Sequence, residues 1–358
     1  MARRSRPRPA YAAAMRVLLT GASGLLGSHT ARALCDAGHS VRALVRDVAK
    51  AERVLARLGA QGAELVRGDV TDRLGVRAAL ACCDAAVHSA ALPSLDPRDR
   101  ERVVRTNVRG AEHVLECACD AGLDPIVHIS SVAALFPAAG RVMTSDDEPK
   151  RPRDAYAASK AAAERVARAL QGRGHPLVIF YPGQLVAPFD PTIADGVRFL
   201  LTYLEQGVVP LTPGGLPLVD ARDVARAIAA SLTPGLGPRR FMAGGHFLSS
   251  AELSVLLEQI AGRGLLKLPM SGRATRAFGR LADAAQRWLG VSLGGASAES
   301  TEILTRGVPT DDERTQRELG VRWRPARESL HDALAWLCAE GVLDAKHAPR
   351  LARSAGRR

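Results

Sequence analysis

The sequence has no run approaching about 18 apolar residues, so we expect no membrane-spanning helix. Its six cysteines form no pattern of zinc ligands, because Cys117 and Cys119 stand two residues apart on an expected helix and no second pair completes a site. We therefore expect no metal, and free buried thiols in a protein of the reducing cytosol. The Arg-rich residues 1–14 lack the long apolar segment of a secretion signal, which agrees with a cytoplasmic location.

Acidic residues are absent from both ends of the chain. The net charge is +12, but residues 3–8 supply +4 and residues 346–358 supply +5, with no acid in either segment. The body between them carries only about +3. We therefore expect a disordered basic extension at 1–14 and a basic tail at 346–358, both outside the core, and no specific nucleic-acid partner.

The body of the chain alternates strand and helix signals, and its 47% of hydrophobic residues suits a globular protein. Short apolar strands joined by helices predict an α/β fold of the Rossmann type, with a doubly wound parallel sheet. The expected strands are 15–20, 41–45, 63–66, 85–88, 126–130 and 177–181, and the expected helices are 25–37, 72–81, 98–121 and 155–170.

After residue 181 the pattern changes to a proline-rich, irregular segment followed by helices that glycines interrupt. We expect a dinucleotide-binding domain at 15–182 that also receives about 218–248, where 240–243 adds a strand. Residues 183–217 and 249–345 then form a smaller, mostly helical substrate lobe. Within it, 273–289 is an amphipathic helix with Phe278, Leu281, Ala285 and Trp288 along one side.

Three glycines, Gly21, Gly24 and Gly27, lie between the first expected strand and the first helix. In this βαβ context such a loop lets a pyrophosphate approach the backbone and meet a helix N-terminus. The spacing is Gly-x-x-Gly-x-x-Gly, which differs from the common dehydrogenase pattern. The loop predicts a dinucleotide site, the alternative being a tight turn without a ligand.

The end of the second strand predicts which dinucleotide is bound. An acid is needed there to bind a ribose 2′-hydroxyl, but Val45 is apolar and Arg46 follows it. A guanidinium suits a 2′-phosphate, so we favour NADP(H). NAD(H) is the alternative, with Arg46 solvated and Asp47 on the ribose. Asp69, after the third strand, is either an adenine contact or a helix cap.

Tyr156 and Lys160 stand four residues apart on an expected helix, so the ammonium can stabilise a phenolate beside it. Ser130 and Ser131 end the fifth strand, where a hydroxyl could bind a substrate carbonyl while Tyr156 protonates its oxygen. The small residues Ser89, Ala90 and Ala91 follow the fourth strand, where a cofactor would pass.

These features resemble the extended short-chain dehydrogenase/reductase family over about residues 15–340, and most closely its dihydroflavonol-reductase-like branch. The resemblance implies a catalytic triad of Ser131, Tyr156 and Lys160. The motifs that carry it are Thr20–Gly27, Asp69-Val70, Ser89–Ala91, Asn107–Gly110, Ser130-Ser131, Tyr156–Lys160, Tyr181–Gly183 and Leu218–Ala225. The cofactor-binding residues that follow from the residues and the resemblance together are Gly21, Ser23, Gly24, Leu25, Leu26, Gly27, Arg46, Asp69, Val70, Ser89, Ala90, Ala91, Asn107, Tyr156, Lys160, Pro182 and Leu185.

Two departures bear on the substrate. Nucleotide-sugar epimerases and dehydratases of the family usually carry Arg where this chain has Tyr181, and again where it has Leu216-Pro217. The resemblance therefore implies an uncharged or apolar carbonyl or alcohol as the substrate, and it is compatible with a homodimer. The alternatives are a nucleotide-sugar epimerase or dehydratase with retained NAD, and a dinucleotide-sensing regulator without turnover.

Overall fold

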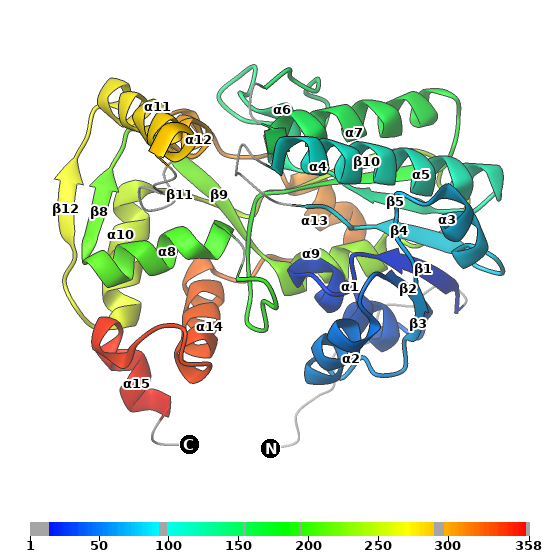
Figure 1. Ribbon diagram of the computed structural model, residues 1–358, viewed down its shortest axis with the longest axis horizontal. Coiled ribbons are helices and arrows are strands. Elements are labelled where there is room, and N and C mark those ends of the chain that lie inside the picture. Colours follow the sequence, from blue (N-terminus) through cyan, green and yellow to red (C-terminus); the bar gives the residue numbers. More distant parts are fainter. Residues whose placement is uncertain (1–13, 93–98, 153–154, 194, 290–296, 356–358) are drawn as a thin grey trace.

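The computed structural model describes residues 14–92, 99–152, 155–193, 195–289 and 297–355. A seven-stranded sheet of order β10-β6-β5-β4-β1-β2-β3 forms the middle layer of one lobe, and every pairing in that sheet is parallel (Figure 1). Its strands are β1 (Arg16–Thr20), β2 (Ser40–Val45), β3 (Glu64–Arg67), β4 (Ala85–His88), β5 (Ile126–Ile129), β6 (Leu177–Pro182) and β10 (Arg239–Ala243). The predicted doubly wound α/β fold is confirmed.

Alternate residues of each strand enter two separate cores, one on each face of the sheet. In β1, Val17 and Leu19 join one core and Leu18 joins the other, and all three are fully buried. A strand buried on both faces must be apolar throughout, which explains the short uninterrupted apolar runs. One face carries α1 (Leu25–Asp36), α2 (Val48–Arg57) and α9 (Ala221–Ala230), and the other carries α3 (Arg73–Ala79), α5 (Gly110–Asp120) and α7 (Ala155–Gly172).

A second lobe has a core of its own and contains more strands than we expected. A three-stranded sheet pairs β9 (Gly215–Asp220) with β11 (His246–Ser249) and β7 (Gln184–Val186), and β8 (Val208–Leu211) pairs with β12 (Leu266–Pro269). Within the stretch 218–248, α9 and β10 pack on the large sheet, whereas β9 pairs with both β7 and β11 in the three-stranded sheet. The other helices after β7 are α8 (Asp195–Gln206), α10 (Ser250–Ala261), α11 (Gly272–Leu289), α12 (Ala298–Arg306), α13 (Glu313–Leu319), α14 (Ala326–Ala339) and α15 (Pro349–Ala355).

Three local expectations need correction. The sequence pattern did not reveal α2 or the short α6 (Val132–Leu135). The single helix expected over 98–121 consists of α4 (Arg100–Val104), a π-helical segment η2 (Arg105–Arg109) and α5, and residue 98 lies outside the described residues. Hydrophobic periodicity cannot register one wide turn inside a continuous helical run, so the π-segment was not predictable from it.

The C-terminal tail also differs from its prediction. Residues 349–355 form α15, and Ala348 and Leu351 are buried in the core of the second lobe. Arg350 donates a hydrogen bond to the Gln259 carbonyl of α10 (2.6 Å). The charge of this segment suggested a solvated tail, but two apolar residues among the arginines are enough to anchor it. The expected disorder of residues 1–14 falls almost wholly on residues 1–13, which lie outside the described residues.

The predicted amphipathic helix at 273–289 is present as α11, but its apolar side faces solvent. The helix packs on α12 through Thr275, Gly279 and Ala282, all of them buried. Phe278, Leu281 and Trp288 are exposed. Over the residues that the structure describes, no helix combines the length and the apolar character that crossing a membrane requires.

Candidate active site

The carboxyl ends of the parallel strands lie along one edge of the sheet, which brings the predicted motifs together. Strands β1, β4, β5 and β6 are neighbours in register and end at Thr20, His88, Ile129 and Pro182. The glycine loop, residues 89–92 and Ser130-Ser131 all follow these ends directly. An edge of this kind is where ligands bind in open α/β sheets.

The glycine loop packs so tightly that a side chain is excluded at Gly21 and at Gly27. Gly21 has φ +78°, and a Cβ there would lie 2.7 Å from the Ala90 amide nitrogen. A Cβ on Gly27 would clash with the Gly21 carbonyl oxygen. The β1–α1 turn is thereby held against the loop after β4.

The N-terminus of α1 is free of side-chain capping. Gly24 is the N-cap residue, no side chain accepts a capping hydrogen bond there, and no acid lies in the first turn. The amides there can therefore bind an anion, and a dinucleotide pyrophosphate fits this cradle. Ser23 and Gly24 are half-buried, whereas Leu25 and Leu26 are buried and anchor the helix.

A buried hydrogen-bond chain connects the glycine loop to the loop after β4. The Thr20 hydroxyl lies 2.9 Å from His88 Nδ1, and the Ala90 amide donates to the same hydroxyl oxygen (3.2 Å). Ser89 and Ala90 are half-buried and Ala91 is exposed. These small residues therefore lie directly beside the glycine cradle.

Near the end of β2, Arg46 and Asp47 differ in what they already bind. Both are exposed, but Asp47 caps α2 by accepting a hydrogen bond from the Lys50 amide (2.9 Å). Asp69 accepts from the Thr71 amide and hydroxyl (2.9 Å each), so it closes a turn, and Asp72 rather than Asp69 caps α3. The helix-cap alternative for Asp69 is therefore wrong.

Val70, next to Asp69, is buried under η2 and α5. A Cβ on Gly110 would lie 2.7 Å from its Cγ2 atom. Its carbonyl oxygen lies 3.2 Å from His113 Nδ1. The side chain of Val70 therefore packs against α5 just after β3.

Ser131 is both a helix cap and a potential donor. Its Oγ accepts a hydrogen bond from the Ala133 amide (3.1 Å), which caps α6. A hydroxyl that accepts in this way keeps its own proton for another partner. Ser130 is buried, and its Oγ has no partner among the described residues.

Lys160 connects α7 to the end of β5. Its side chain is buried, and Nζ donates to the Ile129 carbonyl oxygen (2.7 Å). Burial lowers the Lys160 pKa to about 8, and the carboxylate of Glu164 opposes that shift. Tyr156 lies one helical turn earlier in α7 and is half-buried.

Asn107, in η2, joins the loop after β4 to α7. Its side-chain oxygen accepts from the Leu92 amide (2.7 Å), and its Nδ2 donates to Ser159 Oγ (2.9 Å). Ser159 in turn donates to the Tyr156 carbonyl oxygen (2.7 Å). Asn107 is buried, so these bonds fix the position of α7 relative to the loop after β4. On the other side of the edge lie Pro182, which is buried, and Leu185, which is half-buried.

Sequence reasoning missed two buried histidines beneath Lys160. His88 and His128 are partners in the β4–β5 register, with their rings stacked 5.7 Å apart. Burial lowers the pKa of His88 to about 3 and that of His128 far below its usual value, and the charge of Lys160 adds to both shifts. Their places in adjacent expected strands, 85–88 and 126–130, were the signal that could have revealed the pair.

A second missed group lies between α7 and β6. The Tyr181 hydroxyl donates to Glu164 Oε1 (2.5 Å), and Arg168 Nε donates to the same oxygen (2.7 Å). Tyr181 and Glu164 are fully buried, and burial together with Glu164 raises the Tyr181 pKa. Tyr181 is therefore an internal packing residue that does not present its hydroxyl to the sheet edge.

Comparison with known proteins identifies the family of the chain. The family model of the NAD-dependent epimerase/dehydratase family matches residues 17–244. The chain belongs to this family. It is therefore an NAD(P)-dependent enzyme with an oxidoreductase-type site.

The family includes relatives that match almost the whole chain. Sterol demethylase protein B of Methylococcus capsulatus is 28% identical, over 92% of this chain and 100% of its own length. A 4-hydroxy-2-methyl-3-oxo-4-farnesyl-3,4-dihydroquinoline-1-oxide ketoreductase of Stigmatella aurantiaca is 33% identical, over 89% and 96%. A putative dihydroflavonol 4-reductase of Synechocystis is 27% identical, over 91% and 95%.

Solved structures of the family share the fold. The structure of gox2253 is 27% identical, with a TM-score of 0.75 over 92% of this chain and 99% of that one. DesIV, a dTDP-glucose 4,6-dehydratase of Streptomyces venezuelae solved with NAD bound, is 25% identical, with a TM-score of 0.70 over 92% and 99%.

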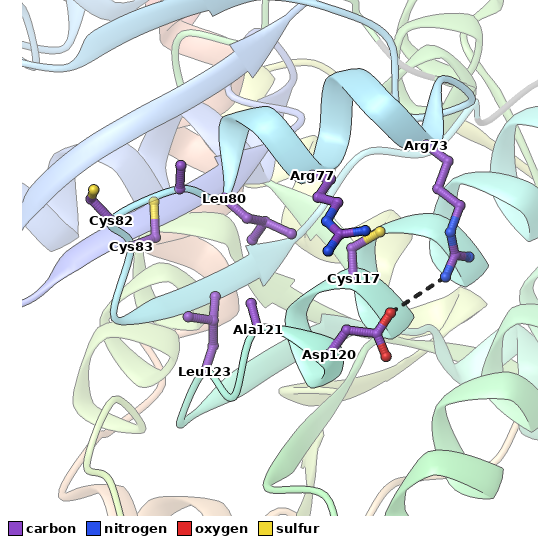
Figure 2. Close-up of a pocket in the computed structure, with 10 residues that line it drawn as sticks. Arg73, Arg77, Leu80, Cys82, Cys83, Cys117, Asp120, Ala121 and Leu123 are labelled. Atoms are coloured by element: carbon purple, nitrogen blue, oxygen red, sulfur yellow. Dashed lines mark ion pairs between the residues drawn. The ribbon is translucent and has the colours of Figure 1, made fainter.

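A pocket of about 260 Å³ between α3 and α5 is separate from the site (Figure 2). None of the residues around it is a predicted site residue. Arg73 at its rim pairs with Glu116 (2.5 Å) and Asp120 (3.5 Å), and burial raises the pKa of the Cys83 and Cys117 thiols. Protonated thiols and a neutralised arginine do not indicate chemistry there.

Proposed function

We propose that this enzyme is an NADP(H)-dependent oxidoreductase that interconverts an apolar carbonyl compound and its alcohol. The observation that carries the proposal is the arrangement at one sheet edge of Lys160 bonded to Ile129, Ser131 with a hydroxyl proton to donate, and Tyr156 on the same helix as Lys160. The uncapped glycine cradle lies on the same edge.

Each side chain has a distinct task. A nicotinamide dinucleotide held at the glycine cradle of Gly21, Gly24 and Gly27 would supply or accept the hydride at the substrate carbon. Ser131 donates a hydrogen bond to the substrate oxygen and so orients the carbonyl. Tyr156 gives its proton to that oxygen in reduction and removes it from the hydroxyl in oxidation, and the Lys160 ammonium favours the phenolate form of Tyr156.

Two buried residues support an apolar substrate. Tyr181 is occupied by Glu164 and Arg168, and Leu216 lies in the core of the second lobe. Neither offers a cation to a diphosphate. The names of two relatives, a sterol demethylase protein and a ketoreductase of a farnesylated ring, agree with a lipophilic substrate class.

NADP(H) rather than NAD(H) is supported by Arg46. Asp47 already accepts the hydrogen bond that caps α2, whereas the Arg46 side chain is exposed and has no hydrogen bond or ion pair within the described part of the chain. A guanidinium at this place matches a 2′-phosphate.

Replacing the proposed proton donor tests the function. With NADPH and a panel of apolar aldehydes and ketones, Tyr156→Phe should lower kcat by about 100-fold or more while the dissociation constant of NADPH changes little, because the ring is retained. Tyr203→Phe, which removes the hydroxyl of a half-buried tyrosine on α8, is the matched control and should keep full activity. Lys160→Ala should weaken both turnover and NADPH binding.

The outcomes separate the alternatives. Retention of more than about a tenth of wild-type kcat by Tyr156→Phe would contradict the proton-donor role. NAD that stays bound through purification, together with turnover of dTDP-glucose, would instead identify a sugar dehydratase, as in DesIV. Dinucleotide binding with no turnover of either substrate class would indicate a sensor.

A further inference from the structure

The outer face of α11 carries large apolar side chains that nothing in the described residues covers. Phe278 is 43% exposed, Leu281 63% and Trp288 79%. The opposite face of the helix, with Thr275, Gly279 and Ala282, packs on α12. Figure 1 shows α11 at the outer rim of the second lobe, above α12 and at the end of β12.

The exposed residues form one stripe rather than isolated contacts. Phe278, Leu281 and Trp288 follow helical spacing, and the small residues Ala274 and Ala277 continue the stripe toward the N-terminus. From 274 to 288 the stripe is about 21 Å long at the rise of an α-helix. We call this surface the α11 stripe. Leu266 and Leu268 of β12, which leads into α11, are also exposed.

Basic side chains border the α11 stripe. Arg273 and Arg280 are exposed and lie two helical turns apart on its flank, whereas Lys267 on β12 is paired with Glu258 (2.8 Å). The only acid in 266–289 is Asp283, whose carboxylate accepts a hydrogen bond from the Ala298 amide of α12. Arg276 and Arg306 share the nearby Glu302. The border of the stripe therefore has an excess of positive charge.

We propose that the α11 stripe docks this enzyme on an anionic lipid bilayer, with α11 lying parallel to the membrane surface. Trp, Phe and Leu on one side of a helix with arginines at its flank are typical of helices that lie in the interfacial region. Negatively charged headgroups complement Arg273 and Arg280. A second copy of the chain would instead bring the same arginines against each other. The inference does not rest on the proposed reaction.

Tryptophan fluorescence of the intact protein tests the docking directly. The chain has three tryptophans, and Trp323 and Trp336 have buried indole nitrogens, so Trp288 is the exposed reporter. Vesicles of phosphatidylcholine with added phosphatidylglycerol should shift the emission to shorter wavelength and carry the protein upward in flotation. Vesicles of phosphatidylcholine alone should give a much smaller emission shift and much less flotation. Trp288→Phe should abolish the shift and retain flotation.

Variants of the α11 stripe separate docking from attraction by the basic ends of the chain. Leu281→Gln with Trp288→Gln, and separately Arg273→Glu with Arg280→Glu, should each weaken flotation by about tenfold or more. Leu74→Gln on α3, where the leucine is 79% exposed like Trp288, is the matched control and should float as wild type does. Unchanged melting temperatures would exclude unfolding as the cause.

Two results would overturn the proposal. Flotation that persists undiminished in both α11 variants would assign binding to the Arg-rich ends of the chain. A dimer in sedimentation that the Leu281→Gln/Trp288→Gln variant dissociates, with no vesicle-induced shift in the wild type, would show that a second copy covers the stripe.

Discussion

Lys160 keeps its charge in a place where burial opposes it. Burial lowers its pKa from the ordinary value of 10.5 to about 8. The Ile129 carbonyl oxygen and the buried Glu164 carboxylate are the groups that favour the ammonium. An anionic dinucleotide beside it would add to them, so cofactor binding and the charge of Lys160 should reinforce each other.

Arg46 determines the proposed cofactor preference. Arg46→Ala should weaken NADPH binding by about 1.5–3 kcal/mol and leave NADH binding nearly unchanged, because a charge-assisted hydrogen bond to the 2′-phosphate is lost. Titration of both dinucleotides measures the difference. Arg53→Ala, at an exposed site on α2, is the control and should change neither affinity. Equal wild-type affinities for the two dinucleotides would instead favour Asp47 on the ribose.

The individual site residues differ in how far the sequence could predict them. The glycine loop and the Tyr156–Lys160 spacing depend on local geometry, which a sequence records directly. The hydrogen-bond partners of Asn107 could not be predicted from local sequence, because Leu92 and Ser159 come close to it only through tertiary packing. For the same reason the sequence left open whether Asp69 caps a helix, a role that the structure gives to Asp72.

At the level of elements, periodic and well-bounded segments were predicted best. Strand β1 and helix α7 lie close to their expected ranges, whereas α6 has four residues and depends on its Ser131 cap. For helix α11 the sequence predicted the helix but not its surroundings. Its amphipathic pattern was correct, but a pattern cannot say whether the apolar side meets the core or the solvent.

The pairing of β4 with β5 has a consequence for acid stability. His88 and His128 stay neutral in the fold, since the pKa of each is lowered far below the usual 6.5, so the unfolded chain takes up protons first as pH falls. The stability that these neutral histidines allow is therefore fully present above about pH 6.5, and the free energy of unfolding declines as the pH falls below that value. At pH 5 each histidine should reduce the free energy of unfolding by about 2 kcal/mol.

Urea unfolding at pH 7.5 and pH 5 measures this effect. His128→Leu should remove about 2 kcal/mol of the difference, because neither His128 ring nitrogen has a partner within the described part of the chain that the substitution would leave unpaired. His331→Leu, at a half-exposed site on α14, is the control and should leave the pH dependence unchanged. A parallel shift at both pH values would show a packing effect instead.

For the whole molecule, the C-terminal segment belongs to the folded body. Leu351→Ala should lower the free energy of unfolding by about 2–5 kcal/mol, since the side chain is buried against the core of the second lobe. Leu236→Ala, where the leucine is 56% exposed, is the control and should have little effect. Thermal and urea unfolding measure both. Equal free energies of unfolding for the wild type and Leu351→Ala would show that this segment does not contribute to the folded core.

The position of β10 in the large sheet matters during synthesis of the protein. A ribosome releases β7, β8 and β9 of the second lobe before Arg239–Ala243, the strand that pairs with β6. Until β10 emerges, the nascent chain displays the open edge of β6, a site at which strands of other chains can pair. The second lobe in turn waits for α14 and α15. The large sheet can therefore close before the core of the second lobe, which should be the last part of this enzyme to fold.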